Sequence, residues 1–371
     1  MKFSCEKSVL QTACLIASRA ASPKSPIPAL EGLLVEASAQ KVCITGYNLR
    51  EGIHTTIDAD VEVFGRSVLN TKLFNEMLRR LPDGIITVDI DRNENCTVNC
   101  GKSFFNIMAI SPEDFPELPE VEEFSTVEIP ENILKSMINQ TYFAIATSDV
   151  RPVYTGILFE IEEGTLNLVA VDGYRLAKRT ETIFGQSSNC SFIVPGYALA
   201  DIERVCDPES EHPVIIFLGD RHISFQIGET VVVSRRLEGE FLNHKKAIPT
   251  NFKYRIKAKK SEVLSVINRV SLVIREKDIS PVRMNFGSDV VRCECSTPIG
   301  KAEDTMLVEG SGEGLEVGFN DKYILDAVKN ASTDEIVFCL NSGSTPCVIE
   351  AADGSKKYTY MVLPVRLRAG S

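Results

Sequence analysis

Apolar and polar positions follow the same pattern in three stretches of the chain, at residues 66–80, 191–205 and 316–330. Each stretch begins 125 residues after the previous one and opens with a short apolar run. A residue that commonly starts helices follows, and then come about three turns in which apolar residues return every three or four positions. Three aligned copies at one long spacing rarely arise by chance, so we expect the chain to consist of three repeats.

The remainder of each repeat predicts a second helix and several strands. Another stretch of helical periodicity opens each repeat. Alternating segments at residues 32–36 and 41–45 recur at residues 156–160 and 165–169, as expected for strands. The chain is therefore predicted to belong to the α+β class, with six helices and roughly two dozen short strands.

Two linkers separate the repeats. Residues 111–124 are acidic and rich in spaced prolines, which favours an extended chain, and residues 237–251 are charged and contain Pro249. The predicted domains are an N-terminal unit at residues 1–124, a middle unit at 125–249 and a C-terminal unit at 250–371.

Composition and charge narrow the class of protein. None of the apolar runs approaches the roughly 20 residues of a membrane helix, and the N-terminus lacks a signal-peptide pattern. The 11 cysteines have no zinc spacing, so we expect reduced, buried thiols in a cytoplasmic protein. The net charge of −11 argues against nucleic-acid binding unless the basic residues are gathered on one surface.

The sequence contains no recognisable constellation of catalytic groups. The four histidines lie outside any zinc or nucleophile motif and are expected at the surface or in loops; they are His54, His212, His222 and His244. Glycines at residues 310–314 fit no nucleotide-binding motif and are expected to form a turn between strands. The sequence predicts no catalytic residue, no metal site and no cofactor; an enzyme with a cryptic acidic site is the alternative.

Many basic residues lie in or beside the predicted helices, whereas the acidic residues dominate linkers and strands. The basic residues concerned are Lys24, Lys72, Arg79, Arg80, Lys135, Arg204, Arg269, Arg275, Lys277, Lys322 and Lys329. One interpretation is an ordinary solvated helix face. The other is a basic lining that holds a DNA backbone without reading its bases.

Three local motifs add a family resemblance. They are A-V-D-G-Y-R-L-A at residues 170–177, S-P-E-D-F-P-E-L at 111–118 and Y-M-V-L-P-V-R-L at 360–367. Together with the repeat, they resemble the bacterial DNA sliding clamp, the β subunit of DNA polymerase III, over residues 1–367.

The resemblance implies three repeated domains of the DNA-clamp fold, with helices lining the inside and antiparallel sheets outside. Two chains would join head to tail as a homodimeric ring around duplex DNA, bound without sequence preference. The implied function is that of a bacterial cytoplasmic processivity factor that is not an enzyme, needs no cofactor and does not bind membranes. Its partners would be the replicative DNA polymerase, the clamp loader and repair proteins, each bound through a short linear peptide.

For DNA binding, the resemblance carries over to five positions, which are Lys24, Lys72, Arg79, Ser148 and Arg151. Gly196 and Tyr197 stand where the family often has a basic pair at the start of the middle helix. The positive lining is therefore expected to be weaker at that helix.

For peptide binding, the resemblance implies an apolar groove between the middle and C-terminal domains. Its positions are Tyr154, Val171, Gly173, Tyr174, Arg175, Leu176, Leu242, Pro346, Met361, Val362, Leu363, Pro364, Val365 and Arg366. Leu242, Lys246 and Ala247 depart from the common proline and arginine-valine, which would alter the peptide preference. The alternative is that residues 361–365 form only a buried final strand.

For the joint between two chains, the resemblance implies two unlike surfaces. Lys102, Phe105 and Ile107 form one side, and Leu272, Val273, Glu303 and Asp304 form the other. Ile299, Gly300 and Lys301 interrupt the acidic strip expected there. A tandem binding module that stays monomeric is the alternative.

Overall fold

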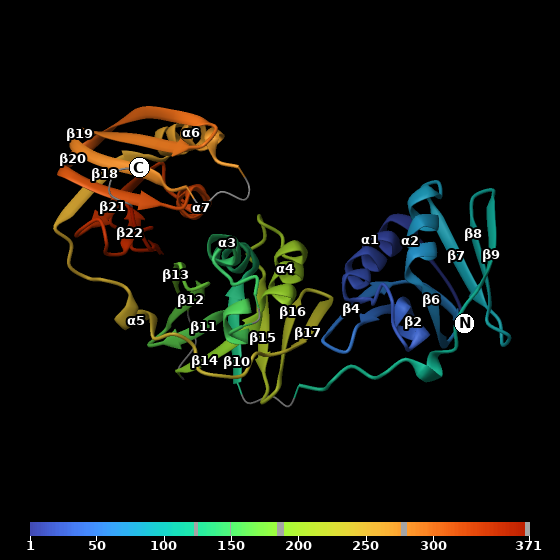
Figure 1. Cartoon of the computed structure of the whole chain (residues 1–371). Helices are drawn as coiled ribbons and strands as arrows, with labels where there is room; N and C mark the ends of the chain where they lie inside the picture. The colour runs from blue at the N-terminus through green and yellow to red at the C-terminus, as the bar shows by residue number, and fades with distance from the viewer. Residues whose placement is uncertain (122–124, 149, 184–188, 276–279, 368–371) are drawn as a thin grey trace. The chain divides into compact units, whose positions relative to one another are not determined.

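The computed structural model describes residues 1–121, 125–148, 150–183, 189–275 and 280–367 (Figure 1). The chain divides into two compact units. Unit 1 comprises Met1–Lys135 and Tyr197–Arg236, and unit 2 comprises Ser136–Gly196 and Leu237–Ser371. The middle repeat thus contributes to both units.

The described residues contain the six predicted α-helices, one further short α-helix and five short 3-10 helices. The α-helices are α1 (Lys7–Ala17), α2 (Thr71–Arg80), α3 (Glu131–Tyr142), α4 (Gly196–Val205), α5 (His244–Ala247), α6 (Lys260–Val270) and α7 (Asp321–Asn330). Helix α5 is a single turn in the second linker that the periodicity did not predict.

Unit 1 contains two antiparallel sheets. The five-stranded sheet has the order β5-β1-β7-β8-β9, with β1 (Lys2–Glu6), β5 (Asp60–Val63), β7 (Ile85–Ile90), β8 (Asn95–Cys100) and β9 (Ser103–Met108). The eight-stranded sheet has the order β10-β15-β16-β17-β4-β3-β2-β6, with β2 (Gly32–Ser38), β3 (Lys41–Tyr47), β4 (Glu51–Asp58), β6 (Gly65–Asn70), β10 (Ser125–Pro130), β15 (Pro213–Leu218), β16 (His222–Ile227) and β17 (Thr230–Arg235).

Unit 2 contains one ten-stranded antiparallel sheet. Its order is β14-β11-β12-β13-β23-β22-β21-β18-β20-β19, with β11 (Gly156–Glu162), β12 (Thr165–Val171), β13 (Arg175–Thr182), β14 (Cys190–Pro195), β18 (Tyr254–Lys259), β19 (Val282–Thr297), β20 (Gly300–Phe319), β21 (Glu335–Leu340), β22 (Cys347–Ala351) and β23 (Tyr358–Val362). The expected turn at residues 310–314 is wrong. These glycines lie within β20, where the register against β19 shifts, so they accommodate a bulge.

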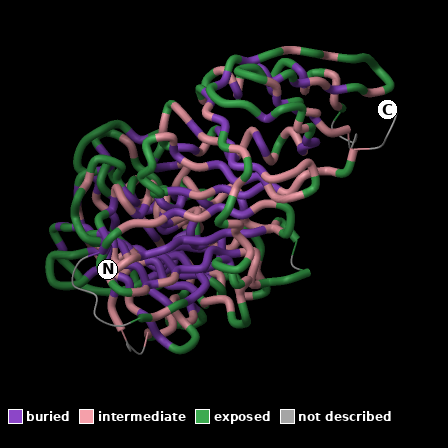
Figure 2. The backbone as a smooth tube through the Cα atoms, turned by 90° about the vertical axis from the view of Figure 1, so that its left-hand side faces the viewer, coloured by how far each residue is buried: buried purple, intermediate pink, exposed green. Residues whose placement is uncertain are grey.

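Helices α1, α2, α6 and α7 each bury one face and contact strands of a sheet in their unit. Helix α2 buries Phe74, Met77 and Leu78 and packs beside α1 in the core of unit 1. The Asn70 side chain begins this helix by accepting a hydrogen bond from the Leu73 N–H at 3.0 Å, and Asn320 begins α7 in the same way. Figure 2 shows the burial along the backbone, with many exposed residues in the bends at the edge of the view.

Strand pairing also joins neighbouring repeats within each unit. In unit 1, β17 pairs with β4, from Thr230 opposite Thr55 to Ser234 opposite Glu51. In unit 2, β13 pairs with β23, from Arg175 opposite Val362 onward. We call these two pairings the first junction and the second junction.

The two junctions begin with the same turn. In the first, the Asn48 Oδ1 accepts hydrogen bonds from the N–H groups of Arg50 and Glu51, at 3.0 and 2.9 Å. In the second, Asp172 accepts from the two residues at the equivalent positions, 124 residues later, at 2.9 and 3.0 Å. The repeat is therefore preserved in individual hydrogen bonds as well as in periodicity.

Candidate functional sites

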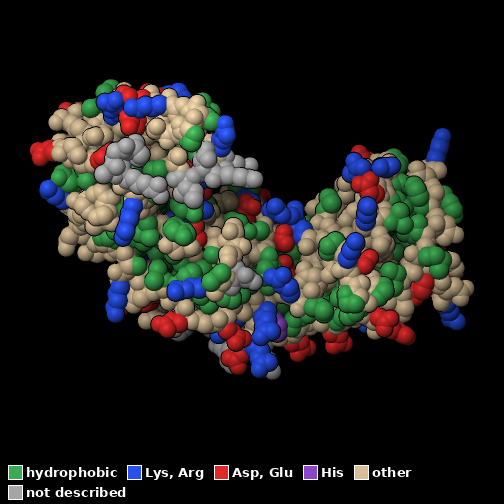
Figure 3. Space-filling view, in the orientation of Figure 1, with side chains coloured by type: hydrophobic (Ala, Val, Ile, Leu, Met, Phe, Trp, Pro, Cys, Tyr) green, Lys and Arg blue, Asp and Glu red, His purple; other side chains and the backbone are tan. Residues whose placement is uncertain are grey.

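Exposed cations occupy the same two positions on the second helix of each repeat, with one exception. The second helical position holds Lys72, Tyr197 and Lys322, and the ninth holds Arg79, Arg204 and Lys329. All are exposed except Tyr197, which is half-buried. Figure 3 shows lysine and arginine side chains over the α1 and α2 side of unit 1, interspersed with acidic ones. The second helix of each repeat therefore carries at least one exposed cation at these two positions.

The five predicted DNA-binding residues all lie at the surface. Lys24 is exposed in the loop between α1 and β2, and Lys72 and Arg79 lie on α2. Arg79 and Arg80 share the Glu76 carboxylate, at 2.8 and 3.1 Å, which offsets part of their charge. Lys277, one of the bases singled out from the sequence, lies outside the described residues.

Ser148 and Arg151 lie in the loop between α3 and β11, in unit 2. Both are exposed, and the Arg151 guanidinium lies over the Tyr154 ring at 5.6 Å and donates to its hydroxyl at 3.2 Å. One predicted DNA-binding residue thus contacts one predicted groove residue.

The predicted groove residues meet at the second junction. Met361 pairs with Leu176 across β23 and β13, and both belong to an apolar cluster with Val171. Tyr154 and Leu242 pack against this cluster and remain partly exposed. Leu363, Pro364 and Val365 are half-buried beyond the end of β23, as is Pro346, and Arg366 is exposed. The last segment is therefore a buried strand only as far as Val362 and a partly open surface after it.

Arg175 is held firmly by the two repeats that meet there. Its Nε lies 2.9 Å from Asp172, and its Nη1 lies 2.5 Å from Asp326 on α7. The guanidinium also lies over the Tyr323 ring at 4.6 Å. Because the side chain is only 12% exposed and already paired twice, it fixes the turn to α7 and has little freedom to bind a ligand.

Sequence reasoning missed two aromatic residues, Phe241 at the border of this cluster and Tyr323 on α7. Tyr323 stacks on Tyr174 with ring centroids 6.0 Å apart, and Phe241 meets Tyr154 edge to face at 5.4 Å. Tyr174 is 62% exposed, so the Tyr174–Tyr323 pair presents an aromatic surface to solvent. The signal available in the sequence was an aromatic residue next to the buried Ile324 of the repeated helix.

The second linker is anchored by a buried histidine. His244 is 2% exposed, which corrects its expected surface position, and its Nε2 lies 3.0 Å from Glu160. Burial lowers the pKa of His244, although the Glu160 carboxylate opposes this shift. Lys245 pairs with Glu162 at 2.5 Å. These contacts hold Leu242, two residues earlier, against the apolar cluster.

The residues expected at the joint between chains lie on two surfaces, one in each unit. Phe105 and Ile107 lie on β9, an edge strand of unit 1, with Phe105 40% exposed, and Lys102 lies in the preceding turn. In unit 2, Leu272 is 81% exposed beside the half-buried Val273. Glu303 and Asp304 pair with Arg292 and Arg269, each at 2.6 Å. An unpaired edge strand that carries exposed aromatic residues is unusual unless a partner covers it.

Other chemistry is sparse. No group of three or more metal-ligating side chains occurs in the described part of the chain. Nine of the 11 cysteines are buried, and burial raises the pKa of Cys96 to about 12, which makes its thiol unreactive. None of the helices among the described residues is long and apolar enough to cross a membrane.

Comparison with known families accounts for the whole architecture. The chain matches the N-terminal domain of the DNA polymerase III beta subunit at residues 1–119, its central domain at 128–243 and its C-terminal domain at 245–366. The chain belongs to the DNA polymerase III beta subunit family.

Relatives of this family match the chain over its full length. It is 28% identical to the beta sliding clamp of Staphylococcus aureus, with 99% of each chain covered. A solved structure from Eubacterium rectale, assigned as a DNA polymerase III beta subunit, is 31% identical with a TM-score of 0.93, covering 98% of this chain and 99% of that one. The Bacillus subtilis sliding clamp is 27% identical with a TM-score of 0.94, covering 99% and 100%.

A third structure carries a ligand. The sliding clamp of Pseudomonas aeruginosa bound to griselimycin is 25% identical with a TM-score of 0.94, covering 99% of this chain and 100% of that one. These matches confirm the predicted clamp fold of three repeated domains and the predicted function. The chain is a DNA sliding clamp, a processivity factor of DNA replication that is not an enzyme.

Proposed function

We propose that this clamp closes head to tail with a second copy into a homodimeric ring, which holds duplex DNA and tethers replication proteins through the groove at the second junction. Dimeric ring closure is known for the family. The observation that carries the DNA-binding part is the recurrence of exposed cations at two fixed positions on the repeated helices. We also propose domain boundaries near residues 124 and 250, and a cytoplasmic location in the bacterium, where replication takes place.

The helix cations suit a ligand that must slide. Lysine and arginine on the solvent face of a helix contact phosphates without reaching base edges, so affinity does not depend on sequence. A ring retains DNA by topology, and moderate affinity is therefore sufficient. The proposed contacts are Lys24, Lys72, Arg79, Ser148 and Arg151. The net charge of −11 limits DNA binding by other surfaces of the protein.

The groove suits a short linear peptide. Leu176, Leu242 and Met361 offer an apolar floor, while Tyr154 and the Tyr174–Tyr323 pair offer aromatic edges. Leucine and phenylalanine anchors would bury against this surface, and the polar ends of the peptide would stay in water. The replicative polymerase, the clamp loader and repair proteins would present such peptides.

The joint would combine the two exposed apolar surfaces. Phe105 and Ile107 on the edge strand β9 need cover, and Leu272 of a second copy is an exposed apolar side chain that could supply it. Two unlike surfaces that meet twice close a two-fold ring. Lys102 on one side and Glu303 with Asp304 on the other add opposite charges.

The test of ring closure is retention on circular DNA. The protein is loaded onto a nicked plasmid by a bacterial clamp loader with ATP, and the isolated complex is then cut once. We expect release on linearisation, because a ring slides off a free end. Retention after the cut would contradict topological binding. A solution mass equal to one chain would contradict the dimer.

A further inference from the structure

The second position of the repeated helices is cationic in the first and third repeats but not in the middle one. Lys72 on α2 and Lys322 on α7 are exposed there, whereas α4 has Tyr197. All three helices keep a cation at the ninth position. The middle helix thus lacks one of the two positive charges that the repeat otherwise provides.

An arginine from the neighbouring repeat lies on the substituted side chain. The guanidinium of Arg50, carried by the turn of the first junction, is 4.4 Å from the centre of the Tyr197 ring. The Tyr197 hydroxyl lies 3.5 Å from the Arg50 carbonyl oxygen and 3.3 Å from the Ser234 Oγ. Tyr197 therefore acts as a platform that holds the turn and its arginine at the start of α4.

The charge of Arg50 is available to a ligand. Arg50 is exposed, and none of the ion pairs found among the described residues involves it. Two further arginines, Arg19 and Arg204, both pair with Asp201, at 3.5 and 3.6 Å. Stacking on an aromatic ring leaves the edge N–H donors of a guanidinium free, which suits it to phosphate oxygens.

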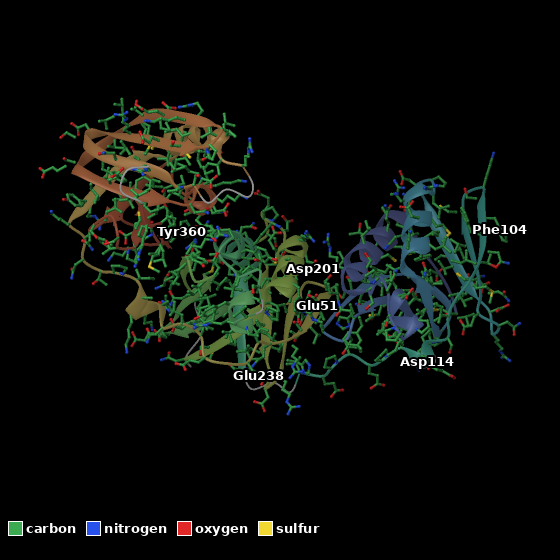
Figure 4. The ribbon with its side chains drawn as sticks, in the orientation of Figure 1. Glu51, Phe104, Asp114, Asp201, Glu238 and Tyr360 are labelled. Carbon is green, nitrogen blue, oxygen red and sulfur yellow. The ribbon has the colours of Figure 1, made fainter. Side chains whose placement is uncertain are left out.

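The carboxyl group closest in sequence does not cancel this charge. Glu51 is only 3% exposed, and its Oε1 has no hydrogen-bond partner. Burial raises the pKa of Glu51 to about 8; the nearby Asp201 adds to the shift and Arg50 opposes it. Figure 4 shows the two carboxyl groups near one another. At neutral pH, Glu51 is therefore largely protonated and does not offset the charge of Arg50.

We propose that Arg50 is a phosphate-contacting residue that supplies, at the start of α4, the cation that Lys72 and Lys322 supply at α2 and α7. The inference rests on the proposed function, because it assigns Arg50 to the same DNA-facing surface. It also revises the expectation that the positive lining is weaker at the middle helix. Held by Tyr197, the guanidinium loses less side-chain freedom on binding than a free lysine would.

The experiment measures equilibrium binding of the full-length protein to a short fluorescent DNA duplex at several salt concentrations. Arg50→Ala is expected to weaken binding about five- to tenfold near 0.1 M salt and to lower the slope of log K against log salt by about 0.9, the value for one phosphate contact. The matched control is Arg92→Ala, which removes an exposed cation from the turn between β7 and β8 and should leave both quantities unchanged.

Rescue separates a charge contact from a structural role. Tyr197→Lys restores the cation of the repeat, so adding it to Arg50→Ala should recover the affinity and the slope. Arg50→Lys should keep most of the slope. An unchanged slope in Arg50→Ala, even with weaker binding, would overturn the proposal.

The Lys72→Ala variant distinguishes failure of the Arg50 proposal from failure of the proposed function. If Lys72→Ala lowers the slope and Arg50→Ala does not, only the role of Arg50 is wrong. If neither variant changes the slope, the repeated helix cations do not contact DNA, and both proposals fail.

Discussion

The two junctions start from the same turn and strand pairing but differ in one charge. The first has Glu51 where the second has Arg175, and each residue faces an aspartate at the equivalent place on the following helix, Asp201 on α4 or Asp326 on α7. In the second junction the result is an ion pair at 2.5 Å. In the first it is a pair of carboxyl groups, of which the buried Glu51 is protonated at neutral pH. The residue at this one position, Glu51 or Arg175, thus decides whether the junction contains an ion pair to the following helix.

The junctions also differ in what covers their apolar clusters. In the first, linker residues Phe115 and Leu118 pack on the cluster, and a Cβ on Gly52 would come within 2.2 Å of the Leu118 side chain. In the second, the position equivalent to Gly52 is Leu176, and the linker contributes Phe241 and Leu242 at the border of the cluster. The chain therefore covers the first cluster with its own linker and leaves the second partly open.

The largest expected effect is a loss of stability when the second junction receives the glutamate that the first junction has at the equivalent position. Arg175→Glu removes two ion pairs and places a third carboxyl group beside Asp172 and Asp326. Because this site is mostly buried, we expect a loss of about 3–5 kcal/mol in the free energy of unfolding. Urea unfolding followed by circular dichroism measures the loss, since the chain has no tryptophan. Arg204→Glu, at a position 57% exposed, should cost less than about 1 kcal/mol. Equal losses in the two variants would contradict the role of Arg175 as a lock.

The next effect is the pH dependence of the first junction. The pKa of Glu51 is raised from 4.5 to about 8 in the folded chain, so ionising this group costs free energy only in the folded state. Stability is therefore full below about pH 4.5 and decreases as the pH rises toward 8. Glu51→Gln should remove this loss and be more stable than the wild type at pH 9, by on the order of 3 kcal/mol.

The comparison for Glu51 requires measurements at two pH values. At about pH 4, below the ordinary value of 4.5, wild type and Glu51→Gln should have nearly the same stability, because the wild-type carboxyl is then mostly protonated in both the folded and the unfolded chain. Glu113→Gln, at an exposed position, serves as the control and should behave as the wild type does at both values. A constant difference between wild type and Glu51→Gln across this range would rule out a titrating Glu51.

The sequence predicted the features that recur in every repeat well, and the contacts between distant residues poorly. Periodicity located six helices, and the 125-residue register located the helix cations, because both depend on local pattern. It could not show that Arg50 lies on Tyr197 or that Arg175 meets Asp326, since these contacts join residues about 150 positions apart. The burial of His244 depends on Glu160 across the linker in the same way. The proposed groove and the proposed joint between chains were expected only from the family resemblance. The sequence of an apolar strand end does not show whether that end is buried or open to solvent.

The smallest expected effect is a loss of peptide affinity. It compares the partly open apolar cluster of the second junction with the covered cluster of the first. Leu242→Ala together with Leu363→Ala removes two half-buried side chains at the second junction. A short peptide with leucine and phenylalanine anchors should then bind at least about tenfold more weakly, or about 1.4 kcal/mol, when followed by fluorescence anisotropy. Leu118→Ala is the matched change at the first junction; it should leave peptide affinity unchanged, because that leucine fills its own site. Loss of peptide binding in Leu118→Ala, with the Leu242 and Leu363 variant unaffected, would place the peptide site at the first junction instead.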